Sequence, residues 1–181
     1  IEMNTRTSTN SWIEREASPI VDAIYRRVAD VLQMDEALLR DRIVYPQSRP
    51  TNQNNDDNDD VTQMSLAESI QIVKYESGQQ YAPHHDFIIP PTTSLYQPTR
   101  FATLIFYLND DYTGGQTTFP RSVNSKNHEG VGVQPVKNKA VLFYSVLEDG
   151  NMDDLSQHSG TPVLEGTKWM ANLWIWDPVI H

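Results

Sequence analysis

Residues 101–108 read FATLIFYL, a run dominated by aromatic and aliphatic side chains. Such side chains are enriched in strands, so this run predicts a buried β-strand. Working outward, two similar runs follow at 140–146 (AVLFYSV) and 169–176 (WMANLWIW). Upstream, residues 69–75 (SIQIVKY) alternate between the two faces that an extended chain presents. These four segments predict a mainly β fold.

Clusters of turn-forming residues separate the predicted strands. Gly114-Gly115 and Asp149-Gly150 are two of them, and no helical pattern intervenes. Many short strands without intervening helices favour a sandwich or barrel. A chain of 181 residues is long enough for one hydrophobic core, so we expect a single domain over residues 1–181.

The clearest helical pattern precedes the strands. Ser18 is a suitable N-cap, and Pro19 stands at the first helical position, where proline is favoured. The apolar residues that then recur at helical spacing are Ile20, Ile24, Val28, Val31 and Leu32. We expect this helix to pack its apolar stripe against one face of the sheet.

A polar stretch predicts a long loop, and the overall charge argues against nucleic-acid binding. Residues 45–63 include PQSRPTNQNNDDNDD, which has no aliphatic side chain, so we expect a long acidic loop there. The chain carries 24 acidic and 14 basic residues, for a net charge of −10. A surface this negative repels phosphate backbones, so we expect no nucleic-acid partner.

Two absences in the sequence exclude further classes. No apolar run approaches the ~18 residues of a membrane-spanning helix, so we expect no span in this chain. There is no cysteine, which excludes disulfides, thiolate metal sites and cysteine nucleophiles.

Possible metal ligands occur in His84-His85-Asp86. Alternate residues of an extended strand share a face, so His84 and Asp86 can point the same way and His85 the other. His158 comes much later, where another strand could bring it alongside. Two histidines and one carboxylate on one side of a metal leave three adjacent positions open, which is the facial triad of non-haem Fe(II) oxygenases.

Lys168 and Tyr75 add a second chemical feature. Lys168 stands at the start of an apolar strand, where a buried ammonium group needs an anionic partner. The distal carboxylate of a keto diacid would supply one, and the Tyr75 hydroxyl could donate to the same carboxylate.

Five separated segments resemble, in order, the prolyl 4-hydroxylase family. Residues 75–86 (YESGQQYAPHHD) resemble its Y-x-x-G-Q-x-Y-x-x-H-x-D signature, and residues 158–169 (HSGTPVLEGTKW) resemble its H-x-G-x-P-V-x-x-G-x-K-W motif. The remaining matches are the RTS loop at 6–8, RFAT leading into FYLN at 100–109, and GGQTTFP at 114–120. The similarity extends from about residue 6 to about residue 178.

The resemblance implies a catalytic domain with a double-stranded β-helix (jelly-roll) core and one or two buttressing helices near the N-terminus. It implies binding of Fe(II), 2-oxoglutarate and O2, with L-ascorbate keeping the iron reduced. The implied reaction hydroxylates proline in a peptide or protein and converts 2-oxoglutarate to succinate and CO2, as procollagen-proline 4-dioxygenases do. The partner would be a proline-rich or single-proline chain, and the resemblance favours the endoplasmic reticulum lumen.

The same resemblance assigns roles to residues. The implied iron ligands are His84, Asp86 and His158. Lys168 would pair with the distal carboxylate of 2-oxoglutarate, aided by Tyr75 and Thr117. The positions that match the peptide groove are Arg6, Ser8, Glu68, Tyr81, Arg100 and Trp174.

Some features depart from the family or stay open. Trp176 stands where many relatives carry a polar residue, and we expect Trp12 and Trp169 to be core aromatics. One alternative is a 2-oxoglutarate oxygenase that modifies another residue or a small molecule. Another is a non-catalytic jelly roll that binds proline-rich chains. The complete set of iron and cosubstrate residues argues against the second. A hydrolytic zinc site would leave Lys168 without a role.

Overall fold

The computed structural model describes residues 6–44, 62–87, 99–123 and 128–177. Its larger sheet is antiparallel and has five strands in the order β1-β4-β13-β6-β10. Their bounds are Thr9–Ile13 (β1), Ile70–Glu76 (β4), Thr167–Trp176 (β13), Arg100–Tyr107 (β6) and Ala140–Tyr144 (β10). The four strands predicted from the sequence are therefore confirmed, and they are neighbours in one sheet.

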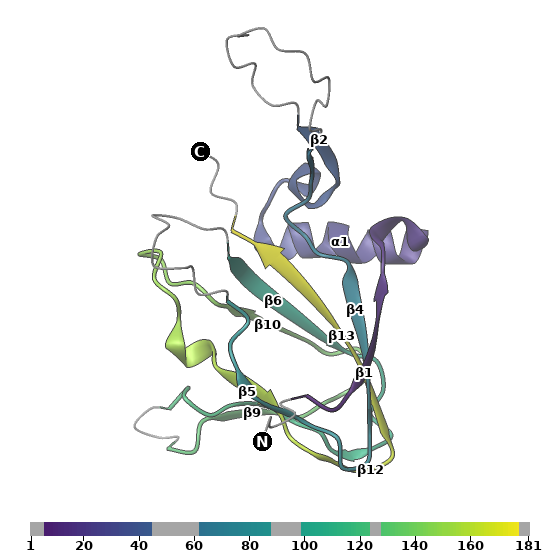
Figure 1. The fold of residues 1–181 in the computed structure, drawn as a ribbon, viewed down its shortest axis with the longest axis vertical. Helices are drawn as coiled ribbons and strands as arrows, with labels where there is room; N and C mark the ends of the chain where they lie inside the picture. Colours follow the sequence, from purple (N-terminus) through teal and green to yellow (C-terminus); the bar gives the residue numbers. More distant parts are fainter. Residues whose placement is uncertain (1–5, 45–61, 88–98, 124–127, 178–181) are drawn as a thin grey trace, which may run out of the picture.

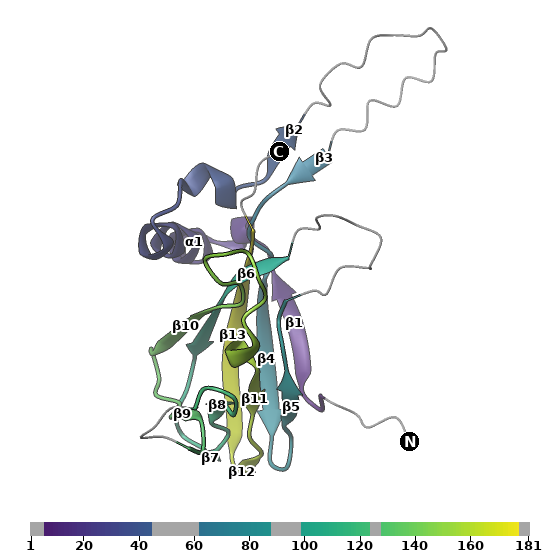
Figure 2. The same cartoon turned by 90° about the vertical axis from the view of Figure 1, so that its left-hand side faces the viewer.

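A smaller sheet has four strands in the order β5-β11-β8-β9. These strands are Tyr81–His84 (β5), His158–Gly160 (β11), Thr117–Phe119 (β8) and Val131–Val133 (β9). Two short ribbons complete the described strands: Thr113–Gly114 (β7) with Val163–Glu165 (β12), and Arg42–Val44 (β2) with Thr62–Met64 (β3). The β2–β3 ribbon projects away from the two sheets (Figure 2). The architecture confirms the mainly β prediction and the jelly-roll expectation.

Helix α1 (Pro19–Leu32) runs across the strands of the larger sheet (Figure 1). The Ser18 hydroxyl accepts a hydrogen bond from the Val21 amide at 3.2 Å, as the N-cap prediction requires. The helix ends at Leu32, and the next residue, Gln33, caps it with a left-handed backbone (φ 53°). The other helical turns are the 3-10 segments Arg15–Ala17 (η1), Glu36–Leu39 (η2) and Asp154–Ser156 (η3).

The buried face of α1 is not the predicted stripe in full. Val28 is buried as expected, but Ile20 and Val31 are exposed, and Tyr25 takes a central place in the core. The Tyr25 hydroxyl donates to the backbone carbonyl of Glu68 at 2.8 Å. A large ring that is buried with its polar end satisfied therefore sets the rotation of the helix, which apolar spacing alone did not reveal.

The central strand β13 serves both the core and the space between the sheets. Ala171, Leu173 and Ile175 belong to the core shared with α1. Residues that line a cavity between the two sheets alternate with them: Lys168, Met170, Asn172 and Trp174. Because side chains alternate along a strand, one face of β13 packs in the core with α1 and the other face lines the cavity.

Strand β4 is likewise covered on both faces. Ile70 packs toward α1. Gln71 and Val73, which alternation places on the opposite face, are also buried.

The acidic loop expected at 45–63 ends earlier, because Thr62 begins β3, and residues 45–61 lie outside the described part. In the described residues, no helix is long and apolar enough to cross a membrane.

The burial of the core face of β13 can be tested with a pair of leucines. Leu173 is 0% exposed, and Leu164 in β12 is 68% exposed. Leu173→Ala should lower the free energy of unfolding by about 2–5 kcal/mol, because it leaves a cavity in the core. Leu164→Ala should change it by less than about 0.5 kcal/mol. Urea unfolding of both variants measures this, and equal losses would contradict the described packing.

Candidate metal centre

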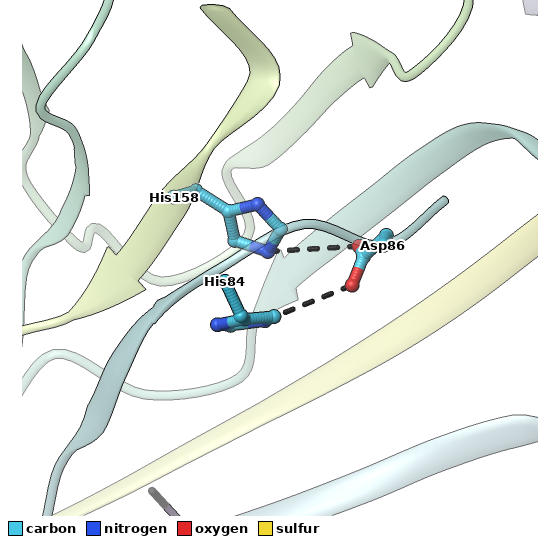
Figure 3. A group of neighbouring side chains, drawn as sticks. All are labelled: His84, Asp86 and His158. Atoms are coloured by element: carbon cyan, nitrogen blue, oxygen red, sulfur yellow. Dashed lines mark ion pairs between the residues drawn. The ribbon is translucent and has the colours of Figure 1, made fainter. Parts of the chain in front are cut away.

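Three ligand-type side chains meet where β5 and β11 pair. His84 ends β5, Asp86 follows two residues later, and His158 begins β11 opposite His84. Nε2 of His84 lies 3.7 Å from Oδ1 of Asp86, and Nε2 of His158 lies 3.5 Å from Oδ2 (Figure 3). All three ligand atoms lie within 4.8 Å of one another. Strand pairing thus brings together the three residues that the sequence analysis singled out. His85 lies outside the cluster, with its Nε2 3.4 Å from Oδ1 of Asp154.

The hydrogen bonds of the two histidines fix their ligating nitrogens. Nδ1 of His84 contacts the Ala82 carbonyl at 2.9 Å, and Nδ1 of His158 contacts the Ser156 carbonyl at 3.0 Å. A carbonyl only accepts, so both Nδ1 atoms carry a proton and the Nε2 atoms are the ones that face the cluster as possible ligands. Burial and the neighbouring His158 lower the pKa of His84 to about 4, which keeps it neutral.

Asp86 is held in its anionic form. Its Oδ2 accepts hydrogen bonds from Oγ1 of Thr103 at 2.8 Å and from Nε1 of Trp174 at 3.0 Å. Burial alone would raise its pKa, but His158 and these two hydrogen bonds lower it below its usual value. Two imidazoles and one carboxylate are the ligand set that fits a divalent iron ion.

Sequence reasoning missed Thr103. One signal was present, because Thr103 is the one aliphatic hydroxyl in the FATLIFYL run, and a buried hydroxyl needs a partner.

A cavity of about 230 Å³ lies between the two sheets and contains the three ligand-type residues. Lys168 lines it and is 2% exposed. Its Nζ donates to the Gly115 carbonyl at 2.6 Å, and among the described residues no carboxylate pairs with it. Burial lowers its pKa to about 8. A buried cation without a counter-ion makes this part of the cavity a site for an anion.

The other two residues expected to hold the cosubstrate line the same cavity. Tyr75 is the cross-strand partner of Lys168, whose Nζ lies 5.5 Å from the centre of the Tyr75 ring. Thr117 is buried, and its Oγ1 accepts a hydrogen bond from the Tyr107 hydroxyl at 2.7 Å.

The expected groove residues fall into two contact groups. In the first, Nε of Arg6 donates to Oγ of Ser8 at 2.8 Å, and its guanidinium lies 5.1 Å from the centre of the Tyr81 ring. Tyr81 in turn stacks on His84, with 3.6 Å between ring centres. Arg6 and Tyr81 therefore reach the cavity directly beside one of the ligand-type histidines.

In the second group, Arg100 makes two hydrogen bonds to Glu68, at 2.6 and 2.9 Å. Its guanidinium lies 4.0 Å from the centre of a Trp174 ring.

The cavity lining also includes Trp12, which is exposed and so is not the core aromatic that we expected. Trp12 belongs to β1, which is an edge strand of the larger sheet in the described part of the chain. Trp169 is also exposed.

Comparison with known proteins agrees with this arrangement. The sequence profile of the 2OG-Fe(II) oxygenase superfamily matches residues 70–176. Probable prolyl 4-hydroxylase 8 of Arabidopsis thaliana is 28% identical over 96% of this chain and 54% of its own length. Prolyl 4-hydroxylase subunit alpha-2 of Caenorhabditis elegans is 28% identical over 94% of this chain and 26% of its own. The chain therefore spans about half or less of these curated relatives.

Solved structures share the fold. A viral collagen prolyl hydroxylase from Paramecium Bursaria Chlorella virus-1, in complex with 2OG, superposes with a TM-score of 0.67 at 22% identity and covers 95% of this chain and 80% of that one. A Pseudomonas putida prolyl-4-hydroxylase gives a TM-score of 0.56 at 18% identity, over 96% of this chain and 74% of that one. At these identities the likeness shows the jelly-roll fold alone.

Removal of any one ligand-type side chain should weaken metal binding and spare the fold. We expect His84→Ala, Asp86→Ala and His158→Ala to lower Co(II) affinity by at least about 100-fold, more than the loss of a supporting residue costs. The strands keep their own core, so thermal unfolding should stay cooperative. Calorimetric titration of the metal-free chain measures the affinity, with His128→Ala in an exposed loop as control. Near-wild-type affinity in any of the three would remove that residue from the centre.

Proposed function

The chain belongs to the 2OG-Fe(II) oxygenase superfamily, and on that premise we propose that it is a prolyl 4-hydroxylase of the procollagen-proline 4-dioxygenase type. It uses Fe(II), 2-oxoglutarate and O2, as its family and its His-Asp-His cluster support. The observation that carries the proposal is the uncompensated Lys168 cation in the same cavity as that cluster. A dicarboxylate that chelates a metal and reaches a buried ammonium group is the substrate such a cavity suits.

We propose that His84, Asp86 and His158 hold the iron. When bound, the iron supplies the activation of O2, so that one oxygen atom enters succinate and the other enters the substrate hydroxyl. The protein residues orient the reactants and exclude water. Lys168 anchors the distal carboxylate of 2-oxoglutarate, and Tyr75 and Thr117 line the same part of the cavity. L-Ascorbate is the reductant that we propose for the iron.

The peptide side of the proposal rests on the two arginines of the cavity. Arg6 and Arg100 line it beside Tyr81 and Trp174. An extended polyproline-II chain makes no internal hydrogen bonds, so its carbonyls are free to accept from arginine. Aromatic rings beside such donors are typical of sites that bind proline-rich chains. We propose a proline-rich or single-proline peptide as the partner.

The experiment that tests the function is succinate release from 2-oxoglutarate in the presence of peptides. A collagen-like repeat and a single-proline peptide should each raise the release of succinate and gain one oxygen atom, located at proline by fragmentation mass spectrometry. The same peptides with alanine in place of proline are the control. Equal turnover with the alanine peptides would overturn the assignment to proline. Oxygen found on another residue would point to a different 2-oxoglutarate oxygenase.

The lowered pKa of Lys168 predicts that the affinity for 2-oxoglutarate depends on pH. Its pKa of about 8, below the ordinary 10.5, means that the cation is lost as the pH rises above 8. Affinity for 2-oxoglutarate should therefore fall above that pH. Lys168→Ala should raise the 2-oxoglutarate requirement roughly tenfold to a hundredfold at pH 7, the value of a charge-assisted hydrogen bond. Lys168→Arg should restore part of it without the decline, because arginine stays protonated.

The apparent affinity for 2-oxoglutarate, measured from pH 6.5 to 9.5, checks these expectations. Lys137→Ala, which removes an exposed lysine, is the matched control. An unchanged affinity in Lys168→Ala would remove this residue as the anchor.

Arg6 and Tyr81 should act on the peptide more than on 2-oxoglutarate. In Tyr81→Phe the ring can still stack on His84, so the cluster should be preserved. Arg6→Ala and Tyr81→Phe should lower peptide hydroxylation several-fold more than the slow conversion of 2-oxoglutarate without peptide. The ratio of the two rates is the measurement, with Tyr144→Phe at an exposed position as control. Parallel loss of both rates would mean that these residues support the cluster instead.

A further inference from the structure

We infer that Thr103 and Trp174 are positioning residues that clamp Asp86 and leave one of its oxygens for the metal. The inference rests on the metal centre of the proposed function, and it gives Trp174 a task other than contact with the peptide. It begins from the two hydrogen bonds that Oδ2 of Asp86 accepts, at 2.8 Å from Thr103 and at 3.0 Å from Trp174.

These two bonds divide the roles of the carboxylate oxygens. A carboxylate oxygen has two lone pairs, so the hydroxyl and the indole N–H together saturate Oδ2. Oδ1 is the oxygen nearer the lone pair of His84, at 3.7 Å from Nε2. The oxygen beside His158 is the saturated Oδ2, 3.5 Å from Nε2 of that residue. The clamp therefore fixes the plane of the carboxylate and leaves Oδ1, the oxygen beside His84, as the available ligand atom. One carboxylate oxygen, and not two, is then available as a ligand.

Burial makes the clamp strong. Asp86 is 7% exposed, Thr103 is 1% exposed and Trp174 is 6% exposed, so water competes for none of these bonds. Rotation of the carboxylate would leave a buried hydroxyl and a buried indole N–H without acceptors, which is unfavourable. An indole buried to this extent also offers little surface to a peptide.

The two donors are a matched pair on the larger sheet. Trp174 of β13 is the cross-strand partner of Thr103 of β6, so their side chains stand together on the face toward the cavity. Asp86 instead follows β5, a strand of the smaller sheet. Two neighbouring strands of the larger sheet thus donate hydrogen bonds to a carboxylate that follows a strand of the smaller sheet.

Arg100 and Glu68 support the clamp from the side of the groove. The Arg100 guanidinium lies 4.0 Å from a Trp174 ring centre, and its two hydrogen bonds to Glu68 hold it there. The backbone carbonyl of Glu68 accepts in turn from the Tyr25 hydroxyl of α1. The indole is therefore fixed at its face by a cation and at its edge by Asp86.

The test is metal affinity in the absence of 2-oxoglutarate and peptide. Co(II) is titrated calorimetrically into the metal-free chain and into Thr103→Val, Thr103→Ser and Trp174→Phe. Loss of a residue that supports a metal ligand weakens binding by about 10–100-fold, so Thr103→Val and Trp174→Phe should each weaken Co(II) binding about tenfold or more. Thr103→Ser keeps the hydroxyl and should stay within about twofold of wild type. Trp169→Phe, an exposed tryptophan on the same strand, is the control.

Each outcome decides the inference. Wild-type Co(II) affinity in a folded Thr103→Val or Trp174→Phe chain overturns the role of that residue. If Trp174→Phe lowers peptide hydroxylation but leaves Co(II) affinity intact, Trp174 is a groove contact and the clamp fails. Should Trp174→Phe not fold, the contrast between Thr103→Val and Thr103→Ser decides.

The assay also separates this inference from the proposed function. If proline is not hydroxylated but Co(II) binding weakens as expected, the clamp stands and the substrate assignment fails. A wild-type chain that does not bind Co(II) overturns both.

Discussion

Two buried charges of opposite sign occupy one cavity without pairing, and the arrangement between the sheets depends on keeping them apart. The Asp86 carboxylate is stabilised by Thr103 and Trp174. Among the described residues, Lys168 contacts only a backbone carbonyl and the rings of two tyrosines, Tyr75 and Tyr107. Each side chain comes from backbone that is held in a paired sheet or directly beside one, which fixes the point from which it enters the cavity. The cavity therefore suits a keto diacid. Its chelating end would bind the metal that Asp86 helps to hold, and its free carboxylate would pair with Lys168.

Cations gather in this cavity although the chain as a whole carries a net charge of −10. Arg6 and Arg100 line it together with Lys168. Low-dielectric walls concentrate the field of such groups, so a dianion is attracted to the cavity while the rest of the surface repels it. The acidic surface and the basic cavity thus act together to direct a small anion to one place.

The features that could be predicted from the sequence are those set by residues close together in the chain. Strand runs, the Ser18 cap and the two-residue spacing of His84 and Asp86 follow from periodicity and short-range chemistry, and the family resemblance brought His158 and Lys168 to the same site. The bond between Trp174 and Asp86 was not predictable in this way, because it depends on the register of β13 beside β6. The exposure of Trp12 and Ile20 escaped prediction for a related reason: apolar character does not reveal whether a neighbour covers the residue.

The alternation along β13 bears on how this protein can change in evolution. Substitutions in β13 can be accepted one at a time, since each affects either the core with α1 or the cavity. Insertion of a single residue after Lys168 is different, because it would exchange the two faces for the rest of the strand. Leu173 would then enter the cavity, and Trp174 would turn toward the helix. We therefore expect changes in chain length to be tolerated in connections such as the turn at Asp149-Gly150 and not within β13.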